Sequence, residues 1–188
     1  MENNSDFQKT VGEQLQREMQ GLGLRLYQKT IDEDLALAAW WSETMNNGEI
    51  EDLFAPTVRP LGAFMAHFRG NASLVYAVDP YGKIYLAVWF EQAFECGAFI
   101  NVWVREDERA SRNSFRALQI IYTFAMRMWK TLLGMTREDL LDMHKKLGYV
   151  VQGRLPELTT DNKQYWLVYL TQEAFKDSKL NIEKEFAL

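Results

Sequence analysis

The sequence predicts one α/β domain in which helices flank a central, mixed and mostly antiparallel sheet. Three observations support this fold class. The chain has 188 residues, which suits one hydrophobic core rather than two. Helical and strand-like apolar patterns alternate along it in the order β-α-α-β-β-β-α-β-α-β-β. Residues 84–90 are apolar almost without interruption, as expected for a strand in a sheet that is covered on both faces.

The first elements are predicted from apolar spacing and capping residues. Residues 7–20 carry apolar side chains at a spacing of four, which fits either a surface-docked helix or an arm for a partner. Residues 24–28 alternate like a strand. Thr30 and Glu33 form a capping-box pattern, so we expect a helix from there to about Met45.

The middle of the chain predicts a helix followed by three strands. Apolar residues share one side of a helix over residues 61–68. Strands are expected over residues 74–78, 83–91 and 98–104. The turn over residues 79–82 has proline in its second position and glycine in its fourth, so the first two strands should form a hairpin.

The second half begins with the clearest helical pattern. Apolar residues recur at spacings of three and four over residues 115–132, and a short strand over residues 132–135 follows. Thr136 to Asp139 resembles a second capping box, whose helix should end at Gly148.

Two strands and a tail complete the predicted order. The strands are expected over residues 149–155 and 164–170, and a polar helical tail begins near Asp177. The resulting division has an N-terminal helical arm, a main α/β domain and a C-terminal tail, at residues 1–23, 24–175 and 176–188.

Charge and composition exclude several classes of function. The net charge of −5 disfavours a nucleic-acid binder that neutralises many phosphates. Cys96 is the single cysteine, so neither an intrachain disulfide nor a cysteine-based zinc site can form, and no metal is expected. Residues 1–6 are polar and acidic, and no apolar stretch reaches the roughly 20 residues that span a bilayer. We therefore expect a cytoplasmic protein without membrane contact.

The element order resembles that of the Gcn5-related N-acetyltransferase (GNAT) superfamily over nearly all of residues 24–175, and two local patterns strengthen the resemblance. The first runs from His144 to Gly153, where a late helix ends in Leu-Gly-aromatic and a strand ends in glycine. The second is an apolar strand that leads through an arginine-rich loop into the long helix. The sequence Leu-Gly-Met-Thr before the late helix is similar to virus-encoded members. This resemblance implies acetyl-CoA as the co-substrate and an amine as the acceptor.

The resemblance also implies where acyl-CoA would bind. The family motif Gln/Arg-x-x-Gly-x-Gly/Ala lets the backbone approach the pyrophosphate at a helix N-terminus. The central glycine is replaced here by Arg112, which departs from the motif. The implied cofactor-binding residues are Val102, Trp103, Val104, Arg109, Ala110, Ser111, Arg112, Asn113 and Ser114.

The arginines of this loop allow two interpretations. Arginine near a helix N-terminus is unfavourable because its positive charge opposes the helix dipole. A bound anion would explain why four arginines gather there. Alternatively, neighbouring acidic residues pair with them on a solvated surface. The arginines are Arg105, Arg109, Arg112 and Arg116, and the acidic residues are Glu106, Asp107 and Glu108.

Candidate catalytic residues follow from the same resemblance. Much of the family has a tyrosine acid four residues before the glycine of Leu-Gly-aromatic, and that position is His144 here. Imidazole can donate a proton near neutral pH, although His144 also fits an ordinary half-exposed helix residue. Many family members also have a glutamate early in the strand before the acyl-CoA loop, but residues 97–101 contain no carboxylate here. Glu91 and Glu95 lie nearby in sequence and could act through water, or they are ordinary turn residues.

The sequence thus predicts an N-acetyltransferase that transfers acetyl directly from the thioester to an amine. The alternative is a non-catalytic protein of the same fold that serves as a binding or assembly module, for example in a virus particle. The altered motif and the glutamine-rich residues 7–20 favour this alternative, in which that helix would join copies or a protein partner. A nucleic-acid-modifying relative is disfavoured by the acidic balance.

Overall fold

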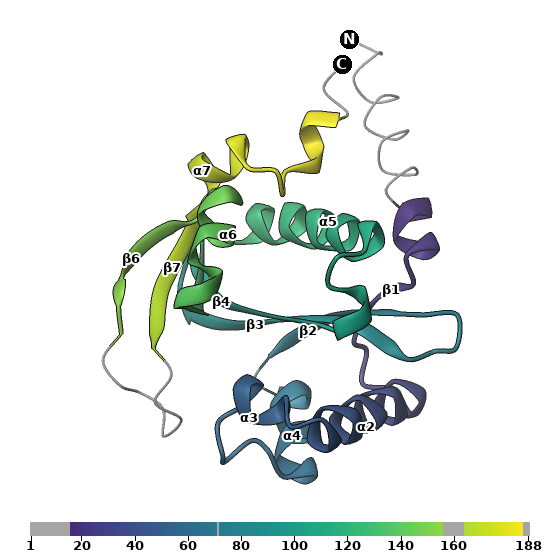
Figure 1. Ribbon diagram of the computed structural model, residues 1–188. Coiled ribbons are helices and arrows are strands. Elements are labelled where there is room, and N and C mark those ends of the chain that lie inside the picture. The colour runs from purple at the N-terminus through teal and green to yellow at the C-terminus, as the bar shows by residue number, and fades with distance from the viewer. Residues whose placement is uncertain (1–15, 71, 156–163, 186–188) are drawn as a thin grey trace. The chain divides into compact units, whose positions relative to one another are not determined.

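The computed structural model describes residues 16–70, 72–155 and 164–185 (Figure 1). The strands are β1 (Leu24–Leu26), β2 (Ser73–Val78), β3 (Ile84–Phe94), β4 (Gly97–Val104), β5 (Thr131–Arg137), β6 (Val150–Arg154) and β7 (Tyr165–Thr171). The helices are α2 (Ile31–Asn46), α3 (Ile50–Leu53), α4 (Leu61–Gly70), α5 (Arg112–Met128), α6 (Leu141–Lys146) and α7 (Gln172–Asp177). Short 3-10 helices are η1 (Glu106–Glu108), η2 (Glu138–Leu140) and η3 (Ile182–Glu185).

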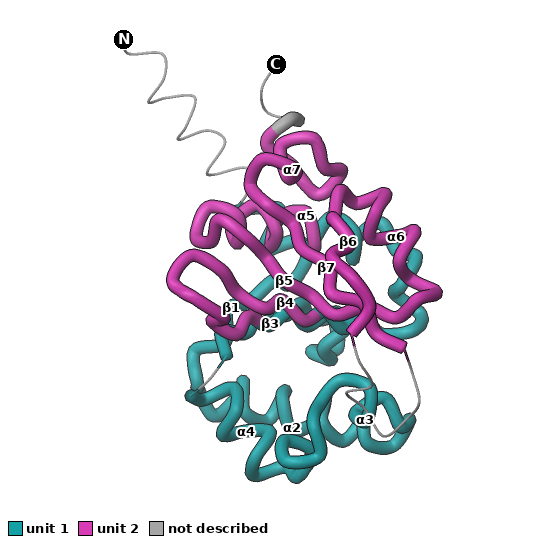
Figure 2. The backbone as a smooth tube through the Cα atoms, turned by 90° about the vertical axis from the view of Figure 1, so that its left-hand side faces the viewer, with its two compact units in different colours: residues 1–89, 102–117 teal, residues 90–101, 118–188 magenta. Residues whose placement is uncertain are grey.

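The strands form one seven-stranded sheet flanked by helices, in the order β1-β2-β3-β4-β5-β7-β6. The predicted α/β class with a mixed sheet is therefore confirmed. The chain forms two compact units (Figure 2). Unit 1 contains the residues up to Trp89 together with Val102–Ala117, and unit 2 contains Phe90–Asn101 and the residues from Leu118 onward. β3, β4 and α5 each pass from one unit to the other.

Helix α2 of unit 1 begins where the sequence predicts. The Thr30 hydroxyl accepts a hydrogen bond from the backbone N–H of Glu33, and the Glu33 carboxylate accepts one from the backbone N–H of Thr30. The predicted capping box is thus confirmed, because both interactions lie within one turn and need no tertiary partner. Helix α3, in contrast, has no predicted counterpart.

An aromatic cluster forms the core of unit 1, packed between helices α2–α4 and strands β2 and β3. Trp40 lies at its centre, with its ring centroid 5.5 Å from those of both Phe64 and Trp103. Phe54 stacks on Trp89 at a centroid distance of 5.1 Å. Burial of such side chains contributes about 1.5–3 kcal/mol each, and the cluster includes Trp103 at the end of β4 and Ile50 at the start of α3.

Unit 2 is organised around β5, which has strand neighbours on both sides. β5 pairs in parallel with β4, through Thr131–Leu133 against Gly97–Phe99, and antiparallel with β7 along its whole length. The pairs with β4 involve the first three residues of each strand. The predicted short strand is thus longer, and α5 ends at Met128 instead of about residue 132.

The second predicted capping box is wrong. Thr136 lies inside β5 opposite Trp166, and its side chain is buried. Neither η2 nor α6 has a side-chain cap. Strand pairing to β7 therefore overrides the local capping pattern at Thr136. The predicted end of the late helix at Gly148 is confirmed, since this glycine has φ +92°.

The two ends of the chain are described in part. Residues 16–21 are helical, and the rest of the predicted helix over residues 7–20 lies outside the described residues. The sequence predicts a polar tail from Asp177, whereas Leu180 and Ile182 are buried in unit 2. Within the described ranges, none of the helices has the length and apolar character needed to cross a membrane.

Candidate functional site

The N-terminus of α5 in unit 1 is capped by a serine. The Ser111 hydroxyl accepts a hydrogen bond of 3.1 Å from the backbone N–H of Ser114, and the Ser111 carbonyl accepts one from the N–H of Phe115. Serine is a favoured N-cap residue because it satisfies a helix donor in this way. Among the described residues, the backbone N–H groups of Arg112 and Asn113 have no acceptor. These donors are available to an anion.

Arg105 is engaged by two carboxylates of unit 1. Its guanidinium bonds Asp79 at 3.0 Å and Asp107 at 2.7 Å. The hydrogen bond to Asp107 raises the pKa of Arg105 further, and the same bond lowers the pKa of Asp107. Arg105 thus anchors η1 to the hairpin turn before β3.

Two further arginines of the loop also have carboxylate partners. Arg109 Nη2 bonds Glu49 at 2.6 Å, while its Nε donates to the carbonyl of Val104. Arg116 Nε bonds Glu18 at 2.8 Å. Arg112 is exposed and, in the described part of the chain, makes no ion pair. Three of the four arginines are thus ion-paired, but within the described ranges only Arg105 has a partner among the neighbouring acidic residues that the sequence predicts, namely Asp107. Arg112 is exposed to solvent.

The side chains at the end of β4 differ in burial. Trp103 is buried in the aromatic cluster, and its indole N–H donates to Glu49 at 2.9 Å. Val102 is 38% exposed. The side chain of Trp103 is therefore committed to the core of unit 1.

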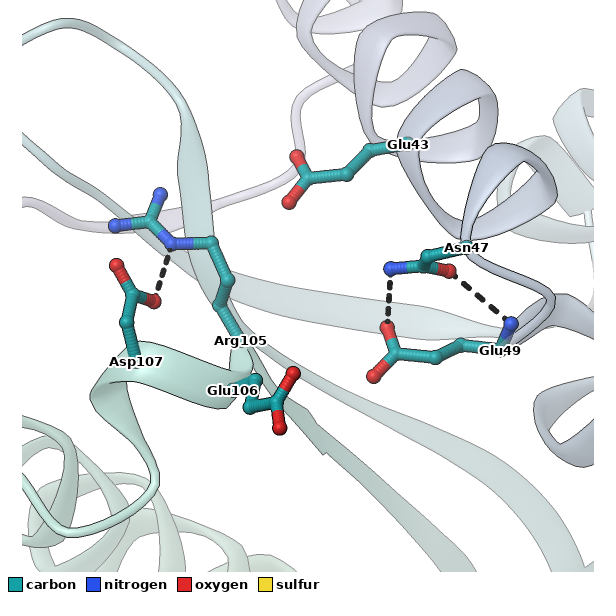
Figure 3. A pocket seen from close by; sticks show the side chains of 6 residues that line it. All are labelled: Glu43, Asn47, Glu49, Arg105, Glu106 and Asp107. Atoms are coloured by element: carbon teal, nitrogen blue, oxygen red, sulfur yellow. Dashed lines mark hydrogen bonds and ion pairs between the residues drawn. The ribbon is translucent and has the colours of Figure 1, made fainter.

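An acidic pocket of about 400 Å³ lies in unit 1 between the end of α2 and η1 (Figure 3). It is lined by Glu43, Asn47, Glu49, Arg105, Glu106 and Asp107. Within the described residues, the carboxylates of Glu43 and Glu106 make no ion pair or hydrogen bond. Two uncompensated negative charges thus face a pocket in which only Arg105 is cationic.

His144 in unit 2 is held at one ring nitrogen. Its Nδ1 lies 3.0 Å from the carbonyl oxygen of Leu140 and 3.2 Å from the hydroxyl of Thr136. The ring packs edge-on against Tyr149 at a centroid distance of 5.2 Å. Burial lowers the pKa of His144, partly offset by the hydrogen bond to Leu140. The imidazole is therefore neutral at pH 7.

Tyr149 and Tyr122 form a buried pair beside this histidine. The Tyr149 hydroxyl donates to the Tyr122 hydroxyl at 2.7 Å. Burial raises the pKa of Tyr122 to about 12 and raises that of Tyr149 as well. Both hydroxyls thus remain protonated at neutral pH.

Solved structures with similar backbones are N-acetyltransferases. A mutant spermidine N-acetyltransferase from Vibrio cholerae has a TM-score of 0.63 and 10% identity, covering 82% of this chain and 97% of that one. The same enzyme in complex with CoA and spermine has a TM-score of 0.61 and 10% identity, with the same coverage. A ribosomal-protein-S5-alanine acetyltransferase from Vibrio fischeri has a TM-score of 0.60 and 12% identity, covering 80% and 92%. The chain has the N-acetyltransferase fold. Neither a protein-family model nor a curated protein matches its sequence.

The predicted site residues of this acetyltransferase fold divide between the two units. The predicted cofactor-binding residues lie in unit 1, whereas His144, Glu91 and Glu95 lie in unit 2. The Glu91 carboxylate accepts a hydrogen bond from Asn101 at 3.3 Å, and Glu95 lies in the turn before β4. His144 contacts neither glutamate.

Three residues that contact the predicted site residues or the adjacent Tyr149 were not predicted from the sequence: Glu49, Tyr122 and Thr136. Glu49 follows a glycine turn and has no motif around it. Tyr122 belongs to the predicted helical stripe, where an aromatic residue indicates only packing. Thr136 could have been found from the alternation of β5, had the capping pattern not competed with it.

Proposed function

We propose that this protein is an acyl-CoA-dependent N-acetyltransferase that transfers acetyl directly to an amine. The likeness of fold to N-acetyltransferases, over 82% of the chain, carries the proposal. In the reaction, the amine nitrogen attacks the thioester carbonyl and the C–S bond breaks. CoA leaves as a thiolate that takes up a proton, so no covalent enzyme intermediate forms.

The N-terminus of α5 supports the acyl-CoA part of the proposal. Free N–H groups at a helix N-terminus bind phosphate well, and the exposed Arg112 adds a positive charge where the family motif has glycine. A similar structure holds CoA. Acetyl-CoA is the acyl donor that we propose for this chain.

Polyamines are the first acceptors to assay. The acidic pocket lined by Glu43, Glu49, Glu106 and Asp107 attracts cations. Spermidine is the named substrate of two of the similar structures, one of which also contains spermine. Both facts support an acceptor that carries several ammonium groups.

Calorimetric titration with acetyl-CoA tests the proposal. We expect binding, and a matching rise in thermal stability by mass action. Arg112→Ala should weaken binding about tenfold through the loss of one charge-assisted hydrogen bond. Arg127→Ala is the matched control, because Arg127 is also an exposed arginine on α5 but pairs with Glu183 near the other end. Equal effects of both variants would remove the α5 N-terminus from the proposed site.

A non-catalytic assembly module is the second candidate. The engagement of Arg109 by Glu49 and of Arg116 by Glu18 favours it, because neither arginine is then free to bind phosphate. No binding at millimolar acetyl-CoA would reject the enzyme and support this second function.

A further inference from the structure

Arg109 is the most exposed of the ion-paired arginines around the start of α5. Its side chain is 55% exposed and reaches the Glu49 carboxylate through one nitrogen, Nη2, at 2.6 Å. Arg116, in contrast, is 23% exposed and bonds both oxygens of Glu18, at 2.8 and 3.1 Å. An exposed ion pair with a single contact adds little stability, because water and salt screen it. Arg109 can therefore change its partner at small cost.

Glu49 keeps its position without Arg109. Its Oε2 accepts hydrogen bonds from the indole N–H of Trp103 at 2.9 Å and from the side-chain amide of Asn47 at 3.0 Å (Figure 3). Trp103 is 4% exposed, so its N–H has little access to water. Two neutral donors thus fix the carboxylate through one oxygen, and the other oxygen, Oε1, holds Arg109. Arg109 is the movable partner of this pair.

Arg109 lies in the turn that leads into α5, within unit 1. In the described part of the chain, the backbone N–H groups of Arg112 and Asn113 in the first turn of this helix have no acceptor. The proposed acyl-CoA would place its pyrophosphate at these donors. A pyrophosphate carries more negative charge than one carboxylate and has more acceptor oxygens, so it binds a guanidinium more strongly. Glu49 and the pyrophosphate therefore compete for Arg109.

We propose that Glu49 is an internal competitor of acyl-CoA, which holds Arg109 until the CoA pyrophosphate takes it over. This rests on the proposed acetyltransferase function and concerns the regulation of its acyl-CoA site. On binding, the Arg109 guanidinium leaves Oε1 of Glu49 and pairs with the pyrophosphate. Trp103 and Asn47 meanwhile keep the carboxylate in place. An arginine that is paired in the free protein thereby still serves the acyl-CoA site.

Calorimetric titration of the full chain with acetyl-CoA tests the competition. Glu49→Gln keeps an oxygen for Trp103 and removes the charge that holds Arg109. We expect the Kd of acetyl-CoA to fall about 2–5-fold, the effect of one exposed ion pair. Glu43→Gln is the matched control, because it removes a negative charge from the same pocket and, among the described residues, pairs with no arginine. It should leave the Kd unchanged. Equal tightening in both variants would assign the effect to general charge repulsion and overturn the proposal.

A double-mutant cycle separates the Arg109 pair from other effects of Glu49. In the Arg109→Gln background, Glu49→Gln should leave the Kd of acetyl-CoA unchanged, because no guanidinium remains to be released. Tightening that persists without Arg109 would contradict the competition.

Arginine side-chain Nε–H signals in ¹H–¹⁵N spectra report the exchange directly. Saturating acetyl-CoA should shift the Arg109 signal, which is identified by its loss in Arg109→Gln. The signal of Arg105, held by Asp79 and Asp107, should shift less. An Arg109 signal that stays in place at saturation would overturn the proposal. If acetyl-CoA binds with the same Kd to the unaltered chain and to Glu49→Gln, the competition alone fails. If it binds to neither, the proposed function fails as well.

Discussion

Trp103 donates its indole N–H to the carboxylate of Glu49 at 2.9 Å, and the same carboxylate receives Arg109 at 2.6 Å. One side chain at the start of α3 thereby joins the end of β4 to the loop before α5. Glu49 and the ion pair between Arg105 and Asp79 therefore both hold that loop in place.

Loss of the Glu49 carboxylate should destabilise the protein. Glu49→Ala leaves a buried indole N–H unpaired, which costs about 1–3 kcal/mol of unfolding free energy. Glu49→Gln keeps an oxygen acceptor for Trp103 and should cost less than half as much. Urea unfolding measures both, with the exposed Glu51→Gln as control. Equal stability of Glu49→Ala and the unaltered chain would show that the contact adds nothing.

The buried tyrosine pair should show strong coupling in stability. Tyr122→Phe removes the acceptor of the Tyr149 hydroxyl, and we expect a loss of about 1–2 kcal/mol. Removing both hydroxyls leaves no unpaired group, so the double variant should lose less than the sum of the two single variants. A double-mutant cycle by urea unfolding measures this, and additive losses would contradict the pairing.

The same tyrosines should make the protein sensitive to alkali. The pKa of Tyr122 is about 12 in the folded protein, and its ordinary value is 10.0. A raised folded-state pKa contributes stability that is present below pH 10 and is lost as the pH rises towards 12. Urea unfolding between pH 9 and 11.5 should show a decline that is smaller in Tyr122→Phe.

His144 should produce a decline in stability under mildly acidic conditions. Burial lowers its folded-state pKa below the ordinary 6.5, so the unfolded chain binds its proton first as the pH falls. Stability is complete above pH 6.5 and is lost as the pH falls through the folded-state pKa. Urea unfolding from pH 7.5 to 4.5 should show a smaller decline in His144→Gln. An unchanged profile would contradict the buried, neutral histidine.

The acidic pocket should select cationic acceptors. The double variant Glu43→Gln and Glu106→Gln removes the charge of both unpaired carboxylates. We expect KM for spermidine to rise by about 3–10-fold, because the pocket then attracts cations less strongly. Binding of acetyl-CoA, measured by calorimetry, should stay unchanged. Glu173→Gln, an exposed glutamate of α7, is the control. An unchanged KM would remove the pocket from acceptor binding.

Interactions between near neighbours in sequence could be predicted from the residues alone. The capping box of Thr30 and Glu33, the turn after Asp79 and the helix end at Gly148 all form as expected. Each depends on backbone groups within a few residues, so the local sequence contains the whole interaction.

Features that depend on distant partners were misread. Thr136 fits a capping pattern locally, but its pairing with Trp166 keeps it in β5 and brings its hydroxyl to His144. Phe115 belongs to the predicted apolar stripe, yet it is 40% exposed. The segment after Asp177 looks polar, yet it buries Leu180 and Ile182.

By itself, the sequence determined the fold class, the order of the seven strands with helices α2, α4, α5 and α6 between them, and the position of the arginine-rich loop before α5. Apolar periodicity and turn residues set these features locally. Tertiary structure alone decided which polar groups from distant parts of the sequence meet. Glu49 reaches Trp103 and Arg109 across 54 and 60 residues, and the Leu140 carbonyl and Thr136 hydroxyl together hold one nitrogen of His144. A hydrogen bond needs two groups within about 3 Å, and the packing of the core places distant residues within that range.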